Sequence, residues 1–194
     1  GERVVLLGEN GCGKTTFMRL LARLYKPTGG SLTQFIDSAF GQKSRGSKAW
    51  YKRVGVIYQN PDYQLFMPTV RQEICYNAVS PEYAEEIARL FDVYSLWERH
   101  PQSLSEGQKR RVSIAAVAAG KPEVLLLDEP TVGQDYERLK QMTEILNELH
   151  KKSGNTMITV THDMRCAEAF CDKALLIADG VVAEAGGKEL AHRY

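Results

Sequence analysis

The sequence has little of what marks several common classes of protein. It contains no apolar run near the roughly 20 residues that cross a bilayer, so we expect no membrane-spanning helix. Its 25 basic and 24 acidic side chains leave a formal net charge of +1, which gives no basis for nucleic-acid binding through bulk charge. Four cysteines occur without a C-x-x-C pair, which argues against a zinc site and suits a reducing compartment.

The amino-terminal end also lacks a leader pattern. The chain opens GERVVLLG, without the apolar region of a signal peptide, so we expect no secretory targeting. Residues 4–7 form a short apolar strand, and a glycine-rich loop follows at once. Because a domain rarely begins on its central strand, we expect the chain to be a fragment of a larger protein.

The hydrophobic pattern of the 194 residues predicts an α/β fold with a mostly parallel sheet covered by helices. A helical insertion, punctuated by prolines, is expected between residues 61 and 103, and a polar mobile arm over residues 31–53. The predicted strands are 4–7, 54–58, 124–127, 157–161 and 174–178, the last leading through an Asp179–Gly180 hairpin turn into 181–185; the predicted helices are 14–24 and 138–150.

Residues 8–15, GENGCGKT, fit the phosphate-loop pattern G-x-x-x-x-G-K-[ST] between a strand and a helix. The glycines allow the backbone to curl, so that its N–H groups and the helix N-terminus face the phosphates. Lys14 is expected to reach the β- and γ-phosphates and Thr15 to bind Mg²⁺. We interpret Cys12 as a small residue that fits the loop, with redox sensing as the alternative. The predicted phosphate-binding residues are Glu9, Asn10, Gly11, Cys12, Gly13, Lys14, Thr15 and Thr16.

Polar side chains also follow three other predicted strands. Asp128 and Glu129 end an apolar run; Asp128 suits a Mg²⁺ shell, and Glu129 can accept a proton from the attacking water. Gln59 and His162 each follow a strand, and either one alone would pass as a helix cap. Because α/β folds bind ligands at the carboxyl ends of parallel strands, their shared position favours contact with a γ-phosphate. Gln59 is predicted to sense Mg²⁺ or orient water, and His162 to hydrogen-bond the γ-phosphate and the water.

The stretch LSEGQKRRVSIAAV, residues 104–117, predicts the start of a helix. Ser105 and Gln108 have the spacing of a capping box. Gly107 falls in the first turn, where glycine costs about 1 kcal/mol relative to alanine. We interpret Arg110 and Arg111 as a solvated face, with pairing inside the domain or at an interface as alternatives.

These motifs resemble, over nearly the whole chain, the nucleotide-binding domain of ATP-binding cassette proteins. GENGCGKT, Gln59, LSEGQ, LLLDEP, Asp135 and His162 occur in the family's order, and YQNPDYQLF at 58–66 is similar to the energy-coupling-factor branch, which powers uptake of vitamins or transition-metal ions. The resemblance implies a P-loop ATPase core, residues 1–61 and 107–194, and a helical subdomain, residues 62–106. It also implies ATP and Mg²⁺, with Glu129, His162, Gln59 and Lys14 as catalytic residues and Thr15, Gln59 and Asp128 as metal ligands.

The resemblance also implies partners. In this family two domains dock head to tail, so Ser105, Gly107 and Gln108 would bind the ATP of a second nucleotide-binding domain, identical or not, and fused or separate. A helix N-terminus attracts anions and glycine permits close approach, which supports this role. The helical subdomain would grip a transmembrane subunit, which places the chain in the cytoplasm on the inner face of the cell membrane. No nucleic acid is expected as a partner.

Two features depart from the family's pattern. The aromatic residue that stacks on adenine lies upstream of the phosphate loop in the family and is absent from this chain. Gln134 stands where an apolar residue is common, so the contact near Asp135 is expected to differ. Among the aromatic side chains of the insertion we expect mainly core packing, with partner contact as the alternative for Tyr63 and Phe66.

Two other functions share part of this pattern. A non-transport cassette acting in translation or DNA repair is the main alternative, although the heptads of a coiled-coil repair cassette are not seen. A phosphoryl-transferring kinase would share the phosphate loop but would leave LSEGQ unexplained. The sequence does not name a transported substrate, because membrane or binding subunits choose it.

Overall fold

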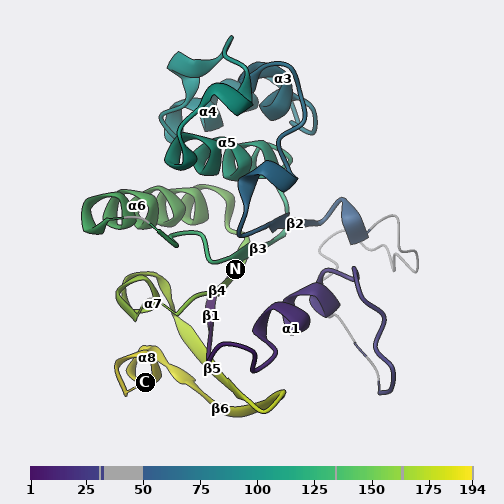
Figure 1. Ribbon diagram of the computed structural model, residues 1–194, viewed down its shortest axis with the longest axis vertical. Helices are drawn as coiled ribbons and strands as arrows, with labels where there is room; N and C mark the ends of the chain where they lie inside the picture. Colours follow the sequence, from purple (N-terminus) through teal and green to yellow (C-terminus); the bar gives the residue numbers. More distant parts are fainter. Residues whose placement is uncertain (31, 33–49, 134, 163, 194) are drawn as a thin grey trace.

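The computed structural model describes residues 1–30, 32, 50–133, 135–162 and 164–193. These residues form a six-stranded sheet in the order β2-β3-β4-β1-β5-β6 (Figure 1). The first five strands are parallel and β6 is antiparallel to β5, which confirms the predicted fold class. The strands are β1 (Arg3–Leu7), β2 (Val54–Ile57), β3 (Val124–Asp128), β4 (Thr156–Val160), β5 (Lys173–Ala178) and β6 (Val181–Gly187).

Helices cover both faces of this sheet. Figure 1 shows α1 (Lys14–Leu21) on one face, and α6 (Tyr136–Ser153), α7 (Met164–Phe170) and α8 (Lys188–Arg193) on the other. The helix predicted over 14–24 ends early, because Arg23 takes a left-handed φ of 57°. The helix predicted over 138–150 is longer at both ends, and α7 and α8 were not predicted. The arm predicted over 31–53 lies mostly outside the described residues.

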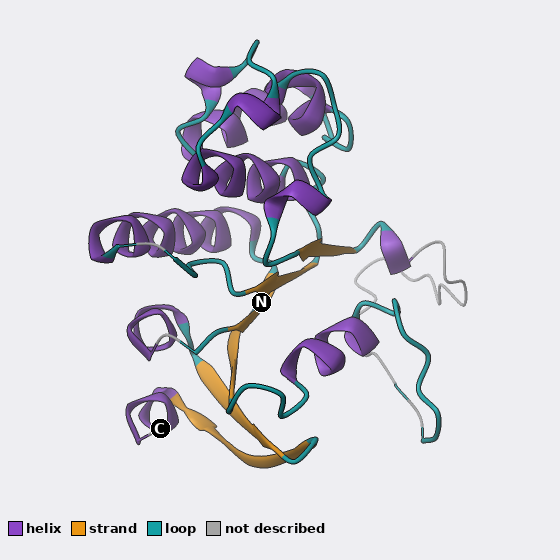
Figure 2. Ribbon diagram, viewed as in Figure 1, coloured by secondary structure: helices purple, strands orange, loops and turns teal. Residues whose placement is uncertain are grey.

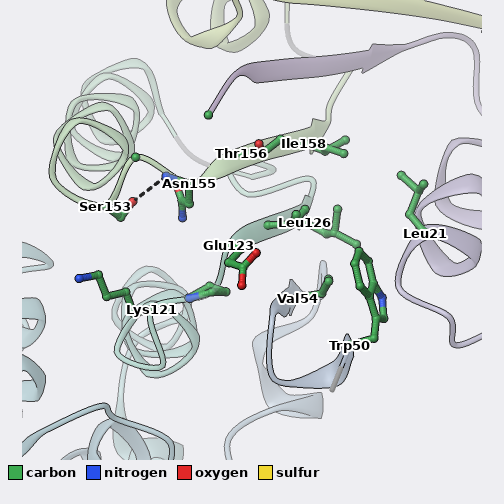
Figure 3. A pocket seen from close by; sticks show the side chains of 14 residues that line it. Leu21, Trp50, Val54, Lys121, Glu123, Leu126, Ser153, Asn155, Thr156 and Ile158 are labelled. Atoms are coloured by element: carbon green, nitrogen blue, oxygen red, sulfur yellow. Dashed lines mark hydrogen bonds between the residues drawn. The ribbon is translucent and has the colours of Figure 1, made fainter. Parts of the chain in front are cut away.

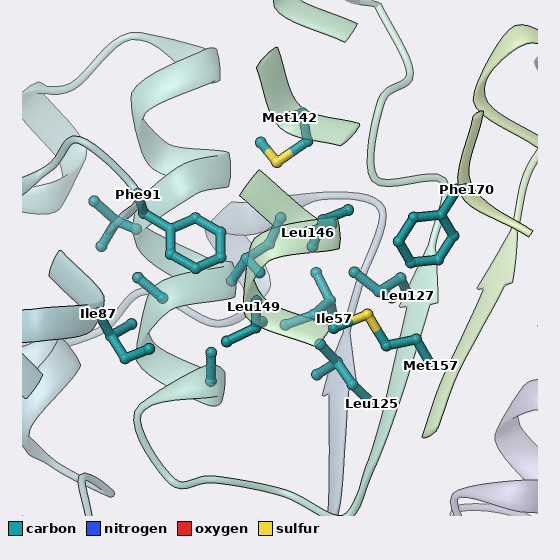
Figure 4. Packing of buried hydrophobic residues seen from close by; sticks show 14 of the residues in the cluster. Ile57, Ile87, Phe91, Leu125, Leu127, Met142, Leu146, Leu149, Met157 and Phe170 are labelled. Carbon is teal, nitrogen blue, oxygen red and sulfur yellow. The ribbon is translucent and has the colours of Figure 1, made fainter. Parts of the chain in front are cut away.

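Neighbouring side chains on the five parallel strands point to opposite faces of the sheet and fill two cores, whereas β6 is largely exposed. Leu125 and Leu127 enter the larger core, which holds side chains of α4, α5, α6 and α7 (Figure 4). Leu126 enters the smaller core beneath α1, together with Met18 and Trp50. Burial on both faces explains why these strands read as unbroken apolar runs.

The hairpin that joins β5 and β6 turns at Asp179 and Gly180, as predicted. Both residues have positive φ, 49° and 77°, as a two-residue type I′ turn requires. The Gly180 N–H donates to the carbonyl oxygen of Cys12 at 3.1 Å. The turn therefore supports the phosphate loop from its outer side.

A helical region lies beyond the β2 edge of the sheet, and helices and loops alone build it (Figure 2). It contains α3 (Val70–Cys75) and α4 (Pro81–Leu90), whose first turns are capped by the side chains of Thr69 and Ser80. Helix α5 (Glu106–Ala118) contacts α3 and α4 as well as β2. It therefore joins the helical region to the sheet.

The aromatic side chains of the helical region divide into two groups. Phe91 is fully buried, and Tyr83, Tyr94 and Trp97 pack against the larger core, so the expectation of core packing is confirmed for these four. Tyr63 and Phe66 are 79% and 68% exposed, so the core does not account for them.

Candidate active site

The loop between β1 and α1 presents backbone N–H groups to an open space. Gly13 precedes α1 with a φ of 108°, and no side chain caps the helix. The first N–H groups of α1 are thus left for an anion, which a helix N-terminus favours. At Gly8 a Cβ atom would lie 2.3 Å from the carbonyl oxygen of Ile177, so only glycine fits there.

Lys14 lies at the floor of this loop and is 6% exposed. Its Nζ donates to the carbonyl oxygens of Gly8 and Glu9, each at 2.8 Å, and lies 3.8 Å from Cys12 Sγ. A buried ammonium needs such acceptors. Phosphate oxygens offer the same acceptor chemistry with more negative charge, so the lysine suits the predicted phosphate contact.

The strand order brings the separate motifs to one edge of the sheet. Because β2, β3, β4 and β1 are successive neighbours, the residues that follow them lie side by side at their carboxyl ends. They line a cleft of about 300 Å³. Of the predicted site residues, this cleft contains Asn10, Gly11, Gly13, Lys14, Thr15, Thr16, Gln59, Asp128, Glu129 and His162.

Asp128 and Thr15 form the candidate magnesium position. The Thr15 hydroxyl lies 3.5 Å from Asp128 Oδ1. Burial, followed by the charge of Glu129, raises the pKa of Asp128, while Arg19, Thr15 and Lys14 act in the opposite direction. Within the described ranges no group of three acidic, histidine or cysteine side chains is arranged around a metal. Mg²⁺ beside phosphates usually takes only one or two protein oxygens, so this pair fits that ion.

Glu129 and His162 form a contact across two neighbouring strands. Glu129 Oε1 lies 2.7 Å from His162 Nδ1, while Glu129 Oε2 is buried and has no hydrogen-bond partner among the described residues. Glu129 also has a φ of 51°, an uncommon conformation for a residue with a Cβ atom. Its N–H donates to the carbonyl oxygen of Val160 at 2.9 Å. A buried carboxylate oxygen without a partner is costly, and such an atom is suited to accept a proton from a bound molecule.

Arg110 corrects one expectation from the sequence. Its side chain is not on a solvated face: the residue is 8% exposed. Its Nη1 donates to the carbonyl oxygen of Glu129 at 2.8 Å, and its Nη2 donates to the carbonyl oxygen of Gln59 at 3.1 Å. The helical spacing of Arg110, Ile114 and Val117 was a signal for this burial. Arg111 pairs within the domain with Asp92, at 3.2 Å.

Gln64 is a second residue whose structural role we did not predict from the sequence. Its Oε1 accepts from the Tyr58 N–H at 3.0 Å, and its Nε2 donates to the Val56 carbonyl oxygen at 2.7 Å. The side chain amide thus pairs with the end of β2 as a neighbouring strand would. It closes the loop that carries Gln59.

The LSEGQ residues do not line the phosphate cleft, although Glu106 and Gly107 share a neighbouring hollow with Gln59. Ser105 and Gln108 form the predicted capping box at the start of α5. Together with Gly107 they line a separate hollow of about 230 Å³, whose other walls include Arg111 and Arg138. A Cβ atom at Gly107 would meet nothing within 4 Å. Packing within the described residues therefore does not require glycine at this position.

A larger hollow, of about 720 Å³, lies at the opposite ends of the strands (Figure 3). Its walls include Trp50, Val54 and Leu126, and it shares no residue with the phosphate cleft. Catalytic groups do not converge there, so we place the chemistry at the smaller cleft.

A phosphate loop, a carboxylate pair and a capped LSEGQ helix on this sheet define a P-loop nucleoside triphosphatase of the cassette type. The family model described as ABC transporter matches residues 1–132. The chain is 39% identical to the energy-coupling factor transporter ATP-binding protein EcfA2 of Bacillus licheniformis, over 96% of this chain and 68% of that protein. The same protein of Bacillus subtilis is also 39% identical, over 96% of this chain and 71% of the relative. The chain therefore belongs to the ABC transporter family.

Solved structures support the same assignment. The structure of cbiO1 from Clostridium perfringens, described as part of the ABC transporter complex cbiONQ, matches with a TM-score of 0.86 and 30% identity, over 99% of this chain and 79% of that one. A dimeric ATP-binding cassette in a post-hydrolysis state with ADP and Pi matches with a TM-score of 0.78 and 25% identity, over 96% of this chain and 85% of the other. In the part of the chain that the structure describes, no helix has the length and apolar character to span a membrane.

Proposed function

We propose that this chain binds and hydrolyses ATP to drive an importer of the energy-coupling-factor type. It is an ATP-binding subunit of that class of ABC transporter, and its activity is ATP hydrolysis coupled to transport. The observation that carries the chemistry is the phosphate cleft, where Lys14, Asp128, Glu129 and His162 converge from separate strand ends. If these four side chains only formed ion pairs or helix caps that stabilise the fold, they would not need to face the same cleft.

Binding rests on charge and on backbone donors. The N–H groups of the loop around Gly13 contact the phosphates, and the Lys14 ammonium exchanges the carbonyls of Gly8 and Glu9 for phosphate oxygens. Each exchange replaces a neutral acceptor with a negatively charged one, so the hydrogen bond of the ammonium gains the attraction between opposite charges. The chain therefore holds the triphosphate before any partner arrives.

Hydrolysis needs a base and a positioned water. Glu129 Oε2, buried without a partner among the described residues, accepts the proton of that water. With its proton on Nδ1, His162 donates to Glu129 Oε1 and so fixes the carboxylate. Gln59, across the cleft, aligns the water. Mg²⁺, held by Thr15 and Asp128 with Gln59 nearby, would neutralise charge that develops on the phosphates.

In this proposal each ATP lies between two nucleotide-binding domains: one domain supplies the phosphate cleft, and its partner supplies the LSEGQ residues. Ser105, Gly107 and Gln108 sit at an exposed helix start, outside the phosphate cleft. The open space beside Gly107 would admit the γ-phosphate held by a second nucleotide-binding domain, identical or different. The exposed Tyr63 and Phe66 supply apolar surface for a transmembrane subunit on the cytoplasmic face of the membrane.

A purified full-length protein tests this function directly. We expect Mg²⁺-dependent release of phosphate from ATP, and we expect Lys14→Ala to lower ATP affinity by about tenfold or more, since a charged hydrogen bond is worth roughly 1.5–3 kcal/mol. Co-purification with membrane proteins would support transport. Co-sedimentation with ribosomes, or phosphate transfer to a small molecule instead of water, would contradict it.

A further inference from the structure

Arg110 connects three parts of the molecule whose relative positions matter for hydrolysis: helix α5, the loop after β3 and the loop after β2. It belongs to α5, the helix that begins with the LSEGQ residues. Its guanidinium reaches the main chain after β3, at the Glu129 carbonyl, and the main chain after β2, at the Gln59 carbonyl, at 2.8 Å and 3.1 Å. One side chain therefore touches both loops that carry proposed catalytic groups.

The backbone at Glu129 explains why such a contact matters. Its φ of 51° belongs to a sparsely populated region, which persists only where surrounding contacts fix it. Three hydrogen bonds do so here: the Glu129 N–H donates to Val160 at 2.9 Å, and the Glu129 carbonyl accepts from Arg110 at 2.8 Å and from the Val132 N–H, within the following turn, at 3.3 Å. The Val160 bond belongs to the sheet, whereas the Arg110 bond comes from α5.

We propose that Arg110 is a positioning residue for hydrolysis, which holds the Glu129 carboxylate and the Gln59 side chain in their reactive arrangement. The inference rests on the proposed role of Glu129 as the base. Through the same contacts, displacement of α5 by a partner at its N-terminus would reach both catalytic loops. Arg110 would thus link partner docking to the chemistry.

The geometry requires a guanidinium. Its planar fork presents two nitrogens that serve two carbonyls at once, whereas lysine offers a single ammonium on a flexible stem. Arg110 is also buried, and that burial lowers its pKa while the carboxylates of Glu106 and Glu129 oppose the shift. A buried cation without its acceptors is costly, so the two carbonyls and the arginine fix one another.

The test compares Arg110→Lys and Arg110→Gln in the full-length protein with Arg89→Gln, an exposed arginine on α4 that pairs with Glu85. We expect both Arg110 variants to lower kcat by about tenfold to a hundredfold, as small misplacements of catalytic groups do. The equilibrium Kd and the KM for ATP should stay within about twofold of the parent, because Arg110 does not line the phosphate cleft. Arg89→Gln should leave both quantities unchanged.

A double variant separates positioning from general damage. In a Glu129→Gln background, Arg110→Lys should lower kcat by a smaller factor than it does in the parent, because the part of its effect that acts through the Glu129 carboxylate is already lost and only the part through Gln59 remains. Thermal unfolding checks that the variants fold. If Arg110→Gln does not fold, Arg110→Lys, which keeps the positive charge, is sufficient to test the inference. An unchanged kcat, a matching loss of ATP affinity, or an additive loss in the double variant would overturn the inference. Full turnover by Glu129→Gln itself would instead overturn the proposed role of Glu129.

Discussion

The phosphate cleft and the LSEGQ hollow treat their polar groups in opposite ways. In the cleft, Lys14, Asp128 and Glu129 are buried, and one oxygen of Glu129 has no partner among the described residues. In the hollow, Ser105 and Gln108 satisfy one another through a capping box. A buried polar group without a partner, such as Glu129 Oε2, is suited to bind a ligand. Groups that cap their own helix, such as Ser105 and Gln108, are stable without one. This difference fits the proposal that the cleft is prepared within this chain and that the hollow is completed by a second nucleotide-binding domain.

Glu129→Gln should have the largest effect, because it removes the proton acceptor and keeps the shape of the side chain. We expect kcat to fall by about a hundredfold to a thousandfold, within the range that general-base catalysis supplies, while ATP binding persists and an ATP-bound dimer accumulates. Phosphate release and analytical ultracentrifugation measure the two effects. Near-normal turnover would remove Glu129 as the base and with it the contrast between cleft and hollow.

Gly107→Asp and Ser105→Arg test the hollow. A carboxylate or a bulky side chain there would meet the partner's phosphate or its loop, and like-charge contacts at interfaces cost several kcal/mol. We expect ATP-driven dimerisation to be lost and kcat to fall by at least about tenfold. Binding of ATP to the single chain should be largely spared.

Glu144→Arg is the matched control for these two variants, because Glu144 is exposed on α6 and lines neither cleft nor hollow. It should dimerise as the parent does. Normal dimerisation and hydrolysis by Gly107→Asp would show that residues 104–108 serve only as a helix cap.

Asp128→Asn should separate function from stability in the cleft. Burial raises the pKa of Asp128 above its ordinary value of 3.8, so ionisation of Asp128 opposes folding. The penalty is absent below the ordinary value, develops as pH rises towards the folded-state pKa, and is complete above it. We therefore expect the nucleotide-free variant to unfold at a temperature higher by a few degrees at pH 7, with no gain near pH 3.5, and to lose Mg²⁺-dependent hydrolysis. An equal shift at both pH values would show that the gain does not come from this ionisation.

Ser80→Ala should have the smallest effect and act on stability alone. The Ser80 hydroxyl accepts from the Tyr83 N–H at 3.2 Å and caps α4, and loss of such a cap costs about 1 kcal/mol. Urea unfolding should show that decrease in the free energy of unfolding, while Ser95→Ala, at an exposed position without a cap, should not. We expect kcat to be unchanged in both, because α4 lies outside the cleft.

The sequence predicted the strands and the cleft well because both follow from local patterns. Five strands are apolar runs, and polar residues at their ends meet wherever the strands are parallel neighbours. It did not predict α7 and α8, whose seven and six residues are too few for helical periodicity to show. Arg110 was misinterpreted because a cluster of three basic residues does not by itself reveal which one faces the interior. The left-handed backbone of Glu129 could not be predicted either, since two of the three hydrogen bonds that hold it come from Val160 and Arg110, which are distant in the sequence.

The hydrogen bonds of Lys14 to its own loop have a consequence for how nucleotide is captured and released. The ammonium holds the carbonyls of Gly8 and Glu9, so it acts as an internal placeholder for a ligand. These bonds support the shape of the loop, and in the proposed phosphate contact they are exchanged for bonds to phosphate oxygens with little reordering of the chain. In the proposed cycle, departure of the product leaves the same two carbonyls free to accept from Lys14 again, so that the buried ammonium always has hydrogen-bond partners.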